Sequence, residues 1–119
     1  PFLSTQTIDE AVFKLAVEKD YDSVFAARKE KRYLWYPDGT PQNYELFHIP
    51  NSTELSDTIT EAMSLYVIRR ATLFNCRSRI GKKPYILQIP LLESIDINTE
   101  EDFAFAEIIR HGLKKEESL

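Results

Sequence analysis

Apolar and polar positions along this chain follow two periods, one helical and one typical of strands. After Thr7, apolar residues recur at helical spacing, and Glu10 completes a capping-box pattern with Thr7. This pattern predicts a first helix that ends near residues 18–20. Near the other end, Thr99 and Asp102 form a second capping-box pattern ahead of an amphipathic stretch, which predicts a last helix.

Continuous apolar runs between these helices predict buried strands, because a strand covered on both faces shows little alternation. The predicted strands are residues 23–27, 62–68 and 85–89. A short helix is predicted over residues 70–77. Residues 51–58 are polar and are predicted to form a loop.

Just before the last helix, Ile95 and Ile97 alternate with polar residues, which is the period of a strand. The pattern predicts a further short strand whose end presents Asp96 and Asn98 as oxygen donors. In open α/β sheets, ligands gather at the carboxyl ends of strands. This turn is therefore the best candidate for chemistry with a hard metal ion or a metal-bound phosphate. The simpler interpretation is that both side chains cap the next helix.

Aromatic residues concentrate in residues 32–50, where the turn sequence 37–40 separates two short apolar stretches. We predict a hairpin with strands over residues 33–36 and 44–48. Pro41 and Pro50 keep this pair out of the centre of a sheet. One small domain cannot readily bury so many aromatic rings, so the hairpin is predicted to project and to contact a second subunit. The expected dimer contacts are Tyr33, Trp35, Tyr36 and Phe47.

The order of these elements predicts an α/β fold with a parallel-rich sheet covered by helices, in one domain over residues 1–119. An α/β unit normally opens on a strand with its ligand loop, whereas this chain opens on a helix. The architecture therefore resembles one half of a larger α/β domain.

Composition narrows the class of protein. The chain has 119 residues, 43% hydrophobic and 29% charged, with a net charge of -4. The acidic balance and the absence of a basic stripe argue against nucleic-acid binding. Cys76 is the single cysteine and no apolar run is long enough to span a membrane, so a reducing cytoplasm is the expected location.

Six segments in order resemble the C-terminal half of the sugar-acid cytidylyltransferases, the family of CMP-sialic acid synthetases and the related pseudaminic and legionaminic acid enzymes. The matching segments are residues 1–2, 7–11, 22–25, 39–44, 50–55 and 93–99. The resemblance implies a partial Rossmann-like fold of the nucleotide-diphospho-sugar transferase type. It also implies a homodimer that joins CTP to a nine-carbon sugar acid and releases pyrophosphate, with Mg²⁺ holding the phosphates.

The resemblance assigns roles to particular residues. Asp96 matches the first acid of the family's metal-binding pair, and Asn98 stands where the second acid is usual. A further set matches the sugar pocket: Asn43, Asn51, Ser52 and Glu54. Many family members carry an arginine at the position of Asn51, which cannot supply that charge.

The family's N-terminal half, with its Gly- and Lys-containing phosphate loop, has no counterpart in these residues. The leading hypothesis is therefore the C-terminal, sugar-side and dimerising portion of a cytidylyltransferase, inactive by itself. The alternative is a non-enzymatic dimerisation module with a degenerate site. A third possibility is a related nucleotidyltransferase that uses another sugar acid.

Overall fold

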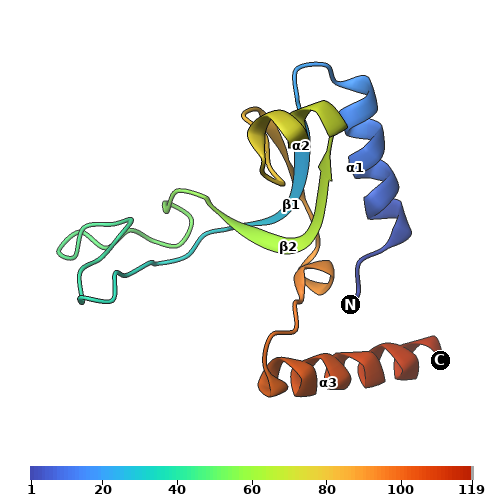
Figure 1. The fold of residues 1–119 in the computed structure, drawn as a ribbon. Helices are drawn as coiled ribbons and strands as arrows, with labels where there is room; N and C mark the ends of the chain where they lie inside the picture. Colours follow the sequence, from blue (N-terminus) through green and yellow to red (C-terminus); the bar gives the residue numbers. More distant parts are fainter. Residues whose placement is uncertain (119) are drawn as a thin grey trace.

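A three-stranded sheet in the order β2-β1-β3 forms the centre of the structure. The computed structural model describes residues 1–118, shown as a ribbon in Figure 1. Along the chain the elements are α1 (Thr5–Val17), β1 (Ser23–Glu30), β2 (Thr58–Ile68), α2 (Arg70–Cys76), β3 (Pro84–Gln88), the 3₁₀ helix η1 (Leu91–Ser94) and α3 (Glu100–Glu117). The α/β class and the three strands predicted from apolar runs are confirmed, although β2 begins at Thr58 rather than at residue 62. Burial of the run is confirmed for β1 but was wrong for β2 and β3, in which Met63 and Ile86 are exposed.

The sheet is mixed, and the prediction of a parallel-rich sheet was wrong. β3 pairs with β1 in parallel, whereas β2 pairs with β1 antiparallel. The connection between β1 and β2 leaves the sheet as a long excursion and returns at the same end, so that Thr58 at the start of β2 pairs with Glu30 at the end of β1. A strand that returns in this way runs antiparallel to its neighbour. The connection through α2 also begins and ends at one end of the sheet, because Ile68 and Pro84 both pair with Ser23, so β3 again runs in the direction of β1.

The core lies between the sheet and α1, which covers one face (Figure 1). Ala11 and Leu15 of α1 pack against Val24 and Ala26 of β1 and Leu87 of β3, all buried. Small residues in β1 let the helix approach the sheet closely. The core is therefore narrow, and it stabilises the sheet without reaching α3.

α1 begins earlier than the sequence pattern predicts. Ser4 is the N-cap, and its hydroxyl accepts a hydrogen bond from the Thr7 amide at 3.2 Å. The expected capping box of Thr7 with Glu10 was wrong because the Thr7 hydroxyl donates instead to Glu93 Oε1, at 2.6 Å. Glu93 comes from η1, so the N-terminus of α1 is joined to a segment far along the chain.

The loop before β3 is held against β1 by Asp22. Its carboxylate accepts hydrogen bonds from the backbone amides of Lys82 at 2.9 Å and Lys83 at 3.1 Å, and from the Ser23 hydroxyl at 2.9 Å. A Cβ placed on Gly81 would lie 2.4 Å from Asp22 Oδ1. Only glycine therefore fits beside this carboxylate.

Gly81→Ala is expected to lower the free energy of unfolding by about 2 kcal/mol, because the new methyl group displaces a carboxylate that the backbone holds in place. Gly112→Ala is the matched control, since a Cβ there meets nothing within 4 Å and alanine favours a helix. Urea denaturation of the two variants measures the difference. Equal midpoints for Gly81→Ala and the parent chain would contradict this packing.

Residues after β3 leave the sheet. The predicted strand around Ile95 and Ile97 was wrong, because the chain forms η1 and then runs extended without a partner strand. Alternation indicates extended backbone, but pairing requires a free neighbouring edge. The capping box of α3 is confirmed: the Thr99 hydroxyl accepts from the Asp102 amide, and the Asp102 carboxylate accepts from the Thr99 amide, both at 3.1 Å.

Residues 31–57 form an arm that extends away from the sheet (Figure 1). The hairpin at its tip is shorter than predicted, with one bridge between Trp35 and Pro41 around a turn in which Gly39 has φ 91°. The predicted partner strand over residues 44–48 was wrong. Glu45 bridges His48 across a tight turn of its own, so these residues fold back on themselves.

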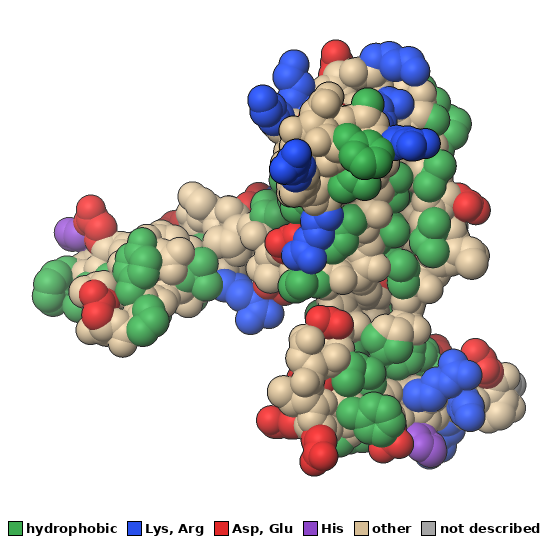
Figure 2. Space-filling view, in the orientation of Figure 1, with side chains coloured by type: hydrophobic (Ala, Val, Ile, Leu, Met, Phe, Trp, Pro, Cys, Tyr) green, Lys and Arg blue, Asp and Glu red, His purple; other side chains and the backbone are tan. Residues whose placement is uncertain are grey.

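The structure exposes more surface than one folded domain of its size usually does. Its accessible area is 9010 Å², whereas a compact monomer of 13.9 kDa exposes about 6,700 Å². The radius of gyration of 17.7 Å also exceeds the value of about 13.5 Å for a compact domain. Figure 2 shows hydrophobic side chains gathered on the arm and on α3. The excess of about 2,300 Å² is comparable with the area that stable assemblies bury.

Candidate functional site

A cavity of about 450 Å³ opens where the arm leaves the sheet, beside the segment that follows η1. Its volume is in the range of small-molecule sites. Three separate parts of the chain line it: Arg28, Glu30, Arg32, Thr60, Glu61, Ala62, Met63, Ser94 and Asp96. Asp96, predicted from sequence as a site residue, therefore lies among charged side chains from β1 and β2.

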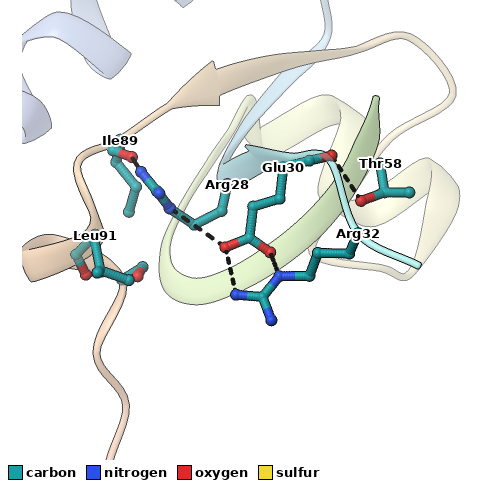
Figure 3. Close-up of polar contacts among 7 residues, drawn as sticks. Arg28, Glu30, Arg32, Thr58, Ile89 and Leu91 are labelled. Atoms are coloured by element: carbon teal, nitrogen blue, oxygen red, sulfur yellow. Dashed lines mark hydrogen bonds and ion pairs between the residues drawn. The ribbon is translucent and has the colours of Figure 1, made fainter. Parts of the chain in front are cut away.

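Charged residues at alternate positions supply one wall of this cavity (Figure 3). Arg28, Glu30 and Arg32 share one side of β1 and its extension, because side chains two residues apart point the same way. Arg32 Nε lies 2.6 Å from Glu30 Oε2, and Arg32 Nη2 donates to Glu30 Oε1 at 3.2 Å. Arg28 Nη1 donates instead to the carbonyl oxygen of Ile89 at 2.9 Å.

A bulge in β2 shapes the opposite wall. Phe25 pairs with Tyr66 and Ala27 pairs with Glu61, so residues 62–65 stand opposite Ala26 alone. Met63, within the bulge, has φ 59°, a left-handed conformation that non-glycine residues adopt at a cost of about 1 kcal/mol. Such bulges often adjoin functional sites, where they redirect side chains. Here the bulge carries Ala62 and Met63 into the lining of the cavity.

The carboxylate of Glu61 interacts with Tyr66 and Arg79. The Tyr66 hydroxyl donates to Glu61 Oε1 at 2.5 Å, and Arg79 Nη2 lies 3.9 Å from the same oxygen. Burial, together with the hydrogen bond to the Glu61 carboxylate, raises the pKa of Tyr66 to about 12. Tyr66 therefore stays protonated near neutral pH and acts as a hydrogen-bond donor rather than as a base.

Asp96 is exposed at the rim of the cavity and accepts two local hydrogen bonds. Its Oδ1 accepts from the Ile97 amide at 3.0 Å, and its Oδ2 accepts from Asn98 Nδ2 at 2.9 Å. Within residues 1–118, no three His, Cys, Asp or Glu side chains are placed to hold a metal ion together. The magnesium site expected at Asp96 therefore stays a prediction.

The residues predicted for sugar binding lie on the arm and do not line the cavity with Asp96. Asn43 ties the arm together: its Oδ1 accepts from the Leu34 amide at 2.9 Å, and its Nδ2 donates to the Arg32 carbonyl at 2.7 Å. Asn51 and Glu54 form a turn in which the Glu54 amide donates to the Asn51 carbonyl at 2.8 Å. Ser52 is exposed within that turn.

The aromatic residues predicted for the dimer interface are exposed on the arm. Phe47 is 90% exposed, while Tyr33, Trp35 and Tyr36 are about half exposed. Tyr33 and Trp35 each contact the ring of Tyr44 edge-on, with centroids 5.3 Å and 6.0 Å apart. The arm therefore has a small aromatic centre of its own and leaves much apolar surface open.

Sequence reasoning missed Arg28, Glu30, Arg32 and Glu61. A signal for the first three was present, because charges at every second position after a buried strand place several on one side. No local pattern marked Glu61. It reaches the site because Glu61 pairs with Ala27, which depends on how β2 pairs with β1.

Searches against protein-family models and against curated proteins find no match for this chain. Over residues 1–118, no helix combines the length and apolar composition that a membrane crossing requires.

Proposed function

We propose that this chain is the C-terminal portion of a nucleotidyltransferase that activates a nine-carbon sugar acid with CTP and releases pyrophosphate. The observation that best supports this function is the cavity beside Asp96, where guanidinium groups, carboxylates and hydroxyls face one small space. A sugar acid carries a carboxylate and many hydroxyls, which are the groups such a lining recognises. The resemblance of residues 93–99 to the sugar-acid cytidylyltransferases adds support from sequence.

In the proposed enzyme, the sheet is the sugar-side part of a Rossmann-like nucleotidyltransferase sheet, and another segment supplies the loop that binds the CTP phosphates. β3 lies at an edge of the sheet, and Ile86 on it is 38% exposed. An edge strand presents unpaired backbone groups to which further strands can add. This edge suits a sheet that continues into a second segment.

Magnesium, when bound, would neutralise charge on the transferring phosphate. Asp96 would hold the ion together with phosphates of CTP and water, since one or two carboxylates plus phosphates are its usual ligands. The side-chain nitrogen Nδ2 of Asn98 donates to Asp96 Oδ2 at 2.9 Å. The side-chain oxygen of Asn98 is therefore left to act as a second ligand. The remaining contribution of the chain is to orient the sugar hydroxyl toward the α-phosphorus.

A mixture of this chain with the proposed nucleotide-binding segment is expected to release pyrophosphate from CTP. Release should require both Mg²⁺ and a sialic-type acid, because the attacking hydroxyl belongs to the acid. The chain alone should release none, and ATP in place of CTP is the control for base selection. A mixture inactive with sialic, pseudaminic and legionaminic acids would contradict the enzymatic proposal.

The second candidate is a non-enzymatic dimerisation module of the same fold. The observation that favours it is the accessible area of 9010 Å² together with the exposed arm, where Phe47 is 90% exposed. This candidate predicts a stable homodimer by light scattering, with no calorimetric signal for CTP and Mg²⁺ in any mixture. Pyrophosphate release by the mixture would exclude it.

A further inference from the structure

Within the cavity, Arg28 and Arg32 both lie within 4 Å of the carboxylate of Glu30. Arg32 binds this carboxylate through two nitrogens, with Nε 2.6 Å from Oε2 and Nη2 3.2 Å from Oε1. Arg28 Nε remains 3.9 Å from Glu30 Oε1, which is too long for a hydrogen bond. One guanidinium therefore has its charge matched by Glu30, while the other is left with donors to offer.

Arg28 is held in place although its charge is not fully matched. Its Nη1 donates to the Ile89 carbonyl at 2.9 Å, which fixes the plane of the guanidinium against the start of the segment leading to η1. Its Nε is buried and has no hydrogen-bond partner within residues 1–118. This Nε is closed off by the protein, but the Arg28 side chain as a whole is 28% exposed and lines the cavity, so the outer part of its guanidinium can meet an acceptor. The site is thus pre-organised for an acceptor.

The other groups that line the cavity indicate what kind of acceptor fits. Arg28 and Arg32 contribute two positive charges, while Glu30, Glu61 and Asp96 contribute three negative ones. This balance disfavours a doubly charged phosphate and accepts a single carboxylate more readily. Thr60, Ser94 and Asp96 offer hydroxyl and carboxylate oxygens across the cavity, which suit the hydroxyl groups of a ligand.

We propose that Arg28 binds the carboxylate of a polyhydroxylated acid in this cavity. Glu30 competes for the guanidinium of Arg28 and so sets the affinity for the acid. This assignment deepens the proposed function and rests on it for the identity of the acid. It places recognition of the carboxylate on β1 rather than on the arm.

The test is nuclear magnetic resonance of the Arg28 Nε–H group in the ¹⁵N-labelled chain, without nucleotide or metal. Adding N-acetylneuraminate is expected to shift this signal to saturation. Its methyl ester, which lacks the charge, and inorganic phosphate are expected to shift it at least 10-fold more weakly. Equal responses to phosphate and to the acid would overturn the assignment to a carboxylate.

Three variants separate the assignment from a general loss of charge or fold. Arg28→Gln should weaken binding of the acid at least 10-fold. Lys29→Gln removes the same charge from the same strand, on a side chain paired with Asp57 at 3.2 Å, and should leave binding unchanged. Glu30→Gln removes the competing carboxylate and should tighten binding several-fold, a gain that damage to the fold cannot produce.

Equal binding by Arg28→Gln and Lys29→Gln, or weaker binding by Glu30→Gln, would overturn the proposal. Failure of the Arg28 proposal can be distinguished from failure of the proposed enzymatic function. Binding of the acid by Arg28 can be present while no pyrophosphate is released, and release of pyrophosphate can be present without any response at Arg28.

Discussion

Replacing Glu93 with alanine is expected to lower the free energy of unfolding by about 3 kcal/mol. One oxygen of this buried carboxylate accepts hydrogen bonds from the Ser4 amide at 2.9 Å, the Ser4 hydroxyl at 3.0 Å and the Thr7 hydroxyl at 2.6 Å. Removing the acceptor leaves these donors at the start of α1 without a charged partner, and bonds to charged groups are the stronger ones. Urea denaturation at pH 7 measures the loss.

Glu10→Ala is the matched control, because Glu10 is the residue that the sequence pattern assigned to the cap of α1. Glu10 is exposed, so its removal should change the free energy of unfolding by less than about 0.5 kcal/mol. Glu93→Gln keeps the shape of the side chain and should cost less than Glu93→Ala. Similar losses for Glu10→Ala and Glu93→Ala would contradict the contacts at the start of α1.

The contribution of Glu93 also predicts a dependence on pH. Burial acts to raise the pKa of Glu93, but the hydrogen bonds from Thr7 and Ser4 outweigh it and hold the pKa below its ordinary value of 4.5. The unfolded chain therefore takes up this proton at a higher pH than the folded chain. The stabilisation is full above about pH 4.5 and is lost as the pH falls through the folded pKa. The difference in free energy of unfolding between the parent chain and Glu93→Ala should therefore decrease as the pH falls below about 4.5.

In the complete enzyme that we propose, Asp96→Ala is expected to reduce CMP-sugar formation about 100-fold or more. The reason is that Asp96 would be the carboxylate that holds Mg²⁺ against the CTP phosphates, and groups that stabilise charge in the transition state contribute on this order. The measurement is pyrophosphate release by the reconstituted mixture over a range of Mg²⁺ concentrations. Raising Mg²⁺ should restore part of the activity.

Two further variants give this prediction its controls. Glu101→Gln removes a nearby acid from the first turn of α3 and should leave activity unchanged, since Glu101 does not line the cavity. Asn98→Asp adds a charged oxygen beside Asp96 and should lower the Mg²⁺ concentration needed for half-maximal activity. Full activity in Asp96→Ala would exclude Asp96 as the metal ligand.

Local signals in the sequence anticipated much of the fold and part of the candidate site. β1, α2 and β3 were located from short-range patterns, as was the cap of α3, because these features depend on residues within a few positions of one another. Asp96 was identified because an acid before a capped helix stands out in sequence. Arg28, by contrast, sits in an ordinary mixed stretch and gains its significance from Ile89, which is 61 residues away.

The errors share a cause. The cap of α1 was assigned to Thr7 with Glu10, three residues along the chain, whereas the Thr7 hydroxyl donates to Glu93, which lies 86 residues away. The strand predicted around Ile95 had the right backbone shape but no neighbour with which to pair. The hairpin over residues 33–48 was predicted to be too long because aromatic residues favour strands. Its pairing ends at Trp35 and Pro41.

The sequence by itself determined where β1, α2, β3 and α3 lie, since periodicity and caps act over one or two turns of chain. It also determined the α/β class, the acidic balance and the presence of an aromatic arm. Only the tertiary structure decided the direction of β2, the bulge at Met63 and the presence of both Arg28 and Asp96 in the lining of one cavity. These depend on contacts between residues far apart in the chain, whose energies arise only when the sheet has formed.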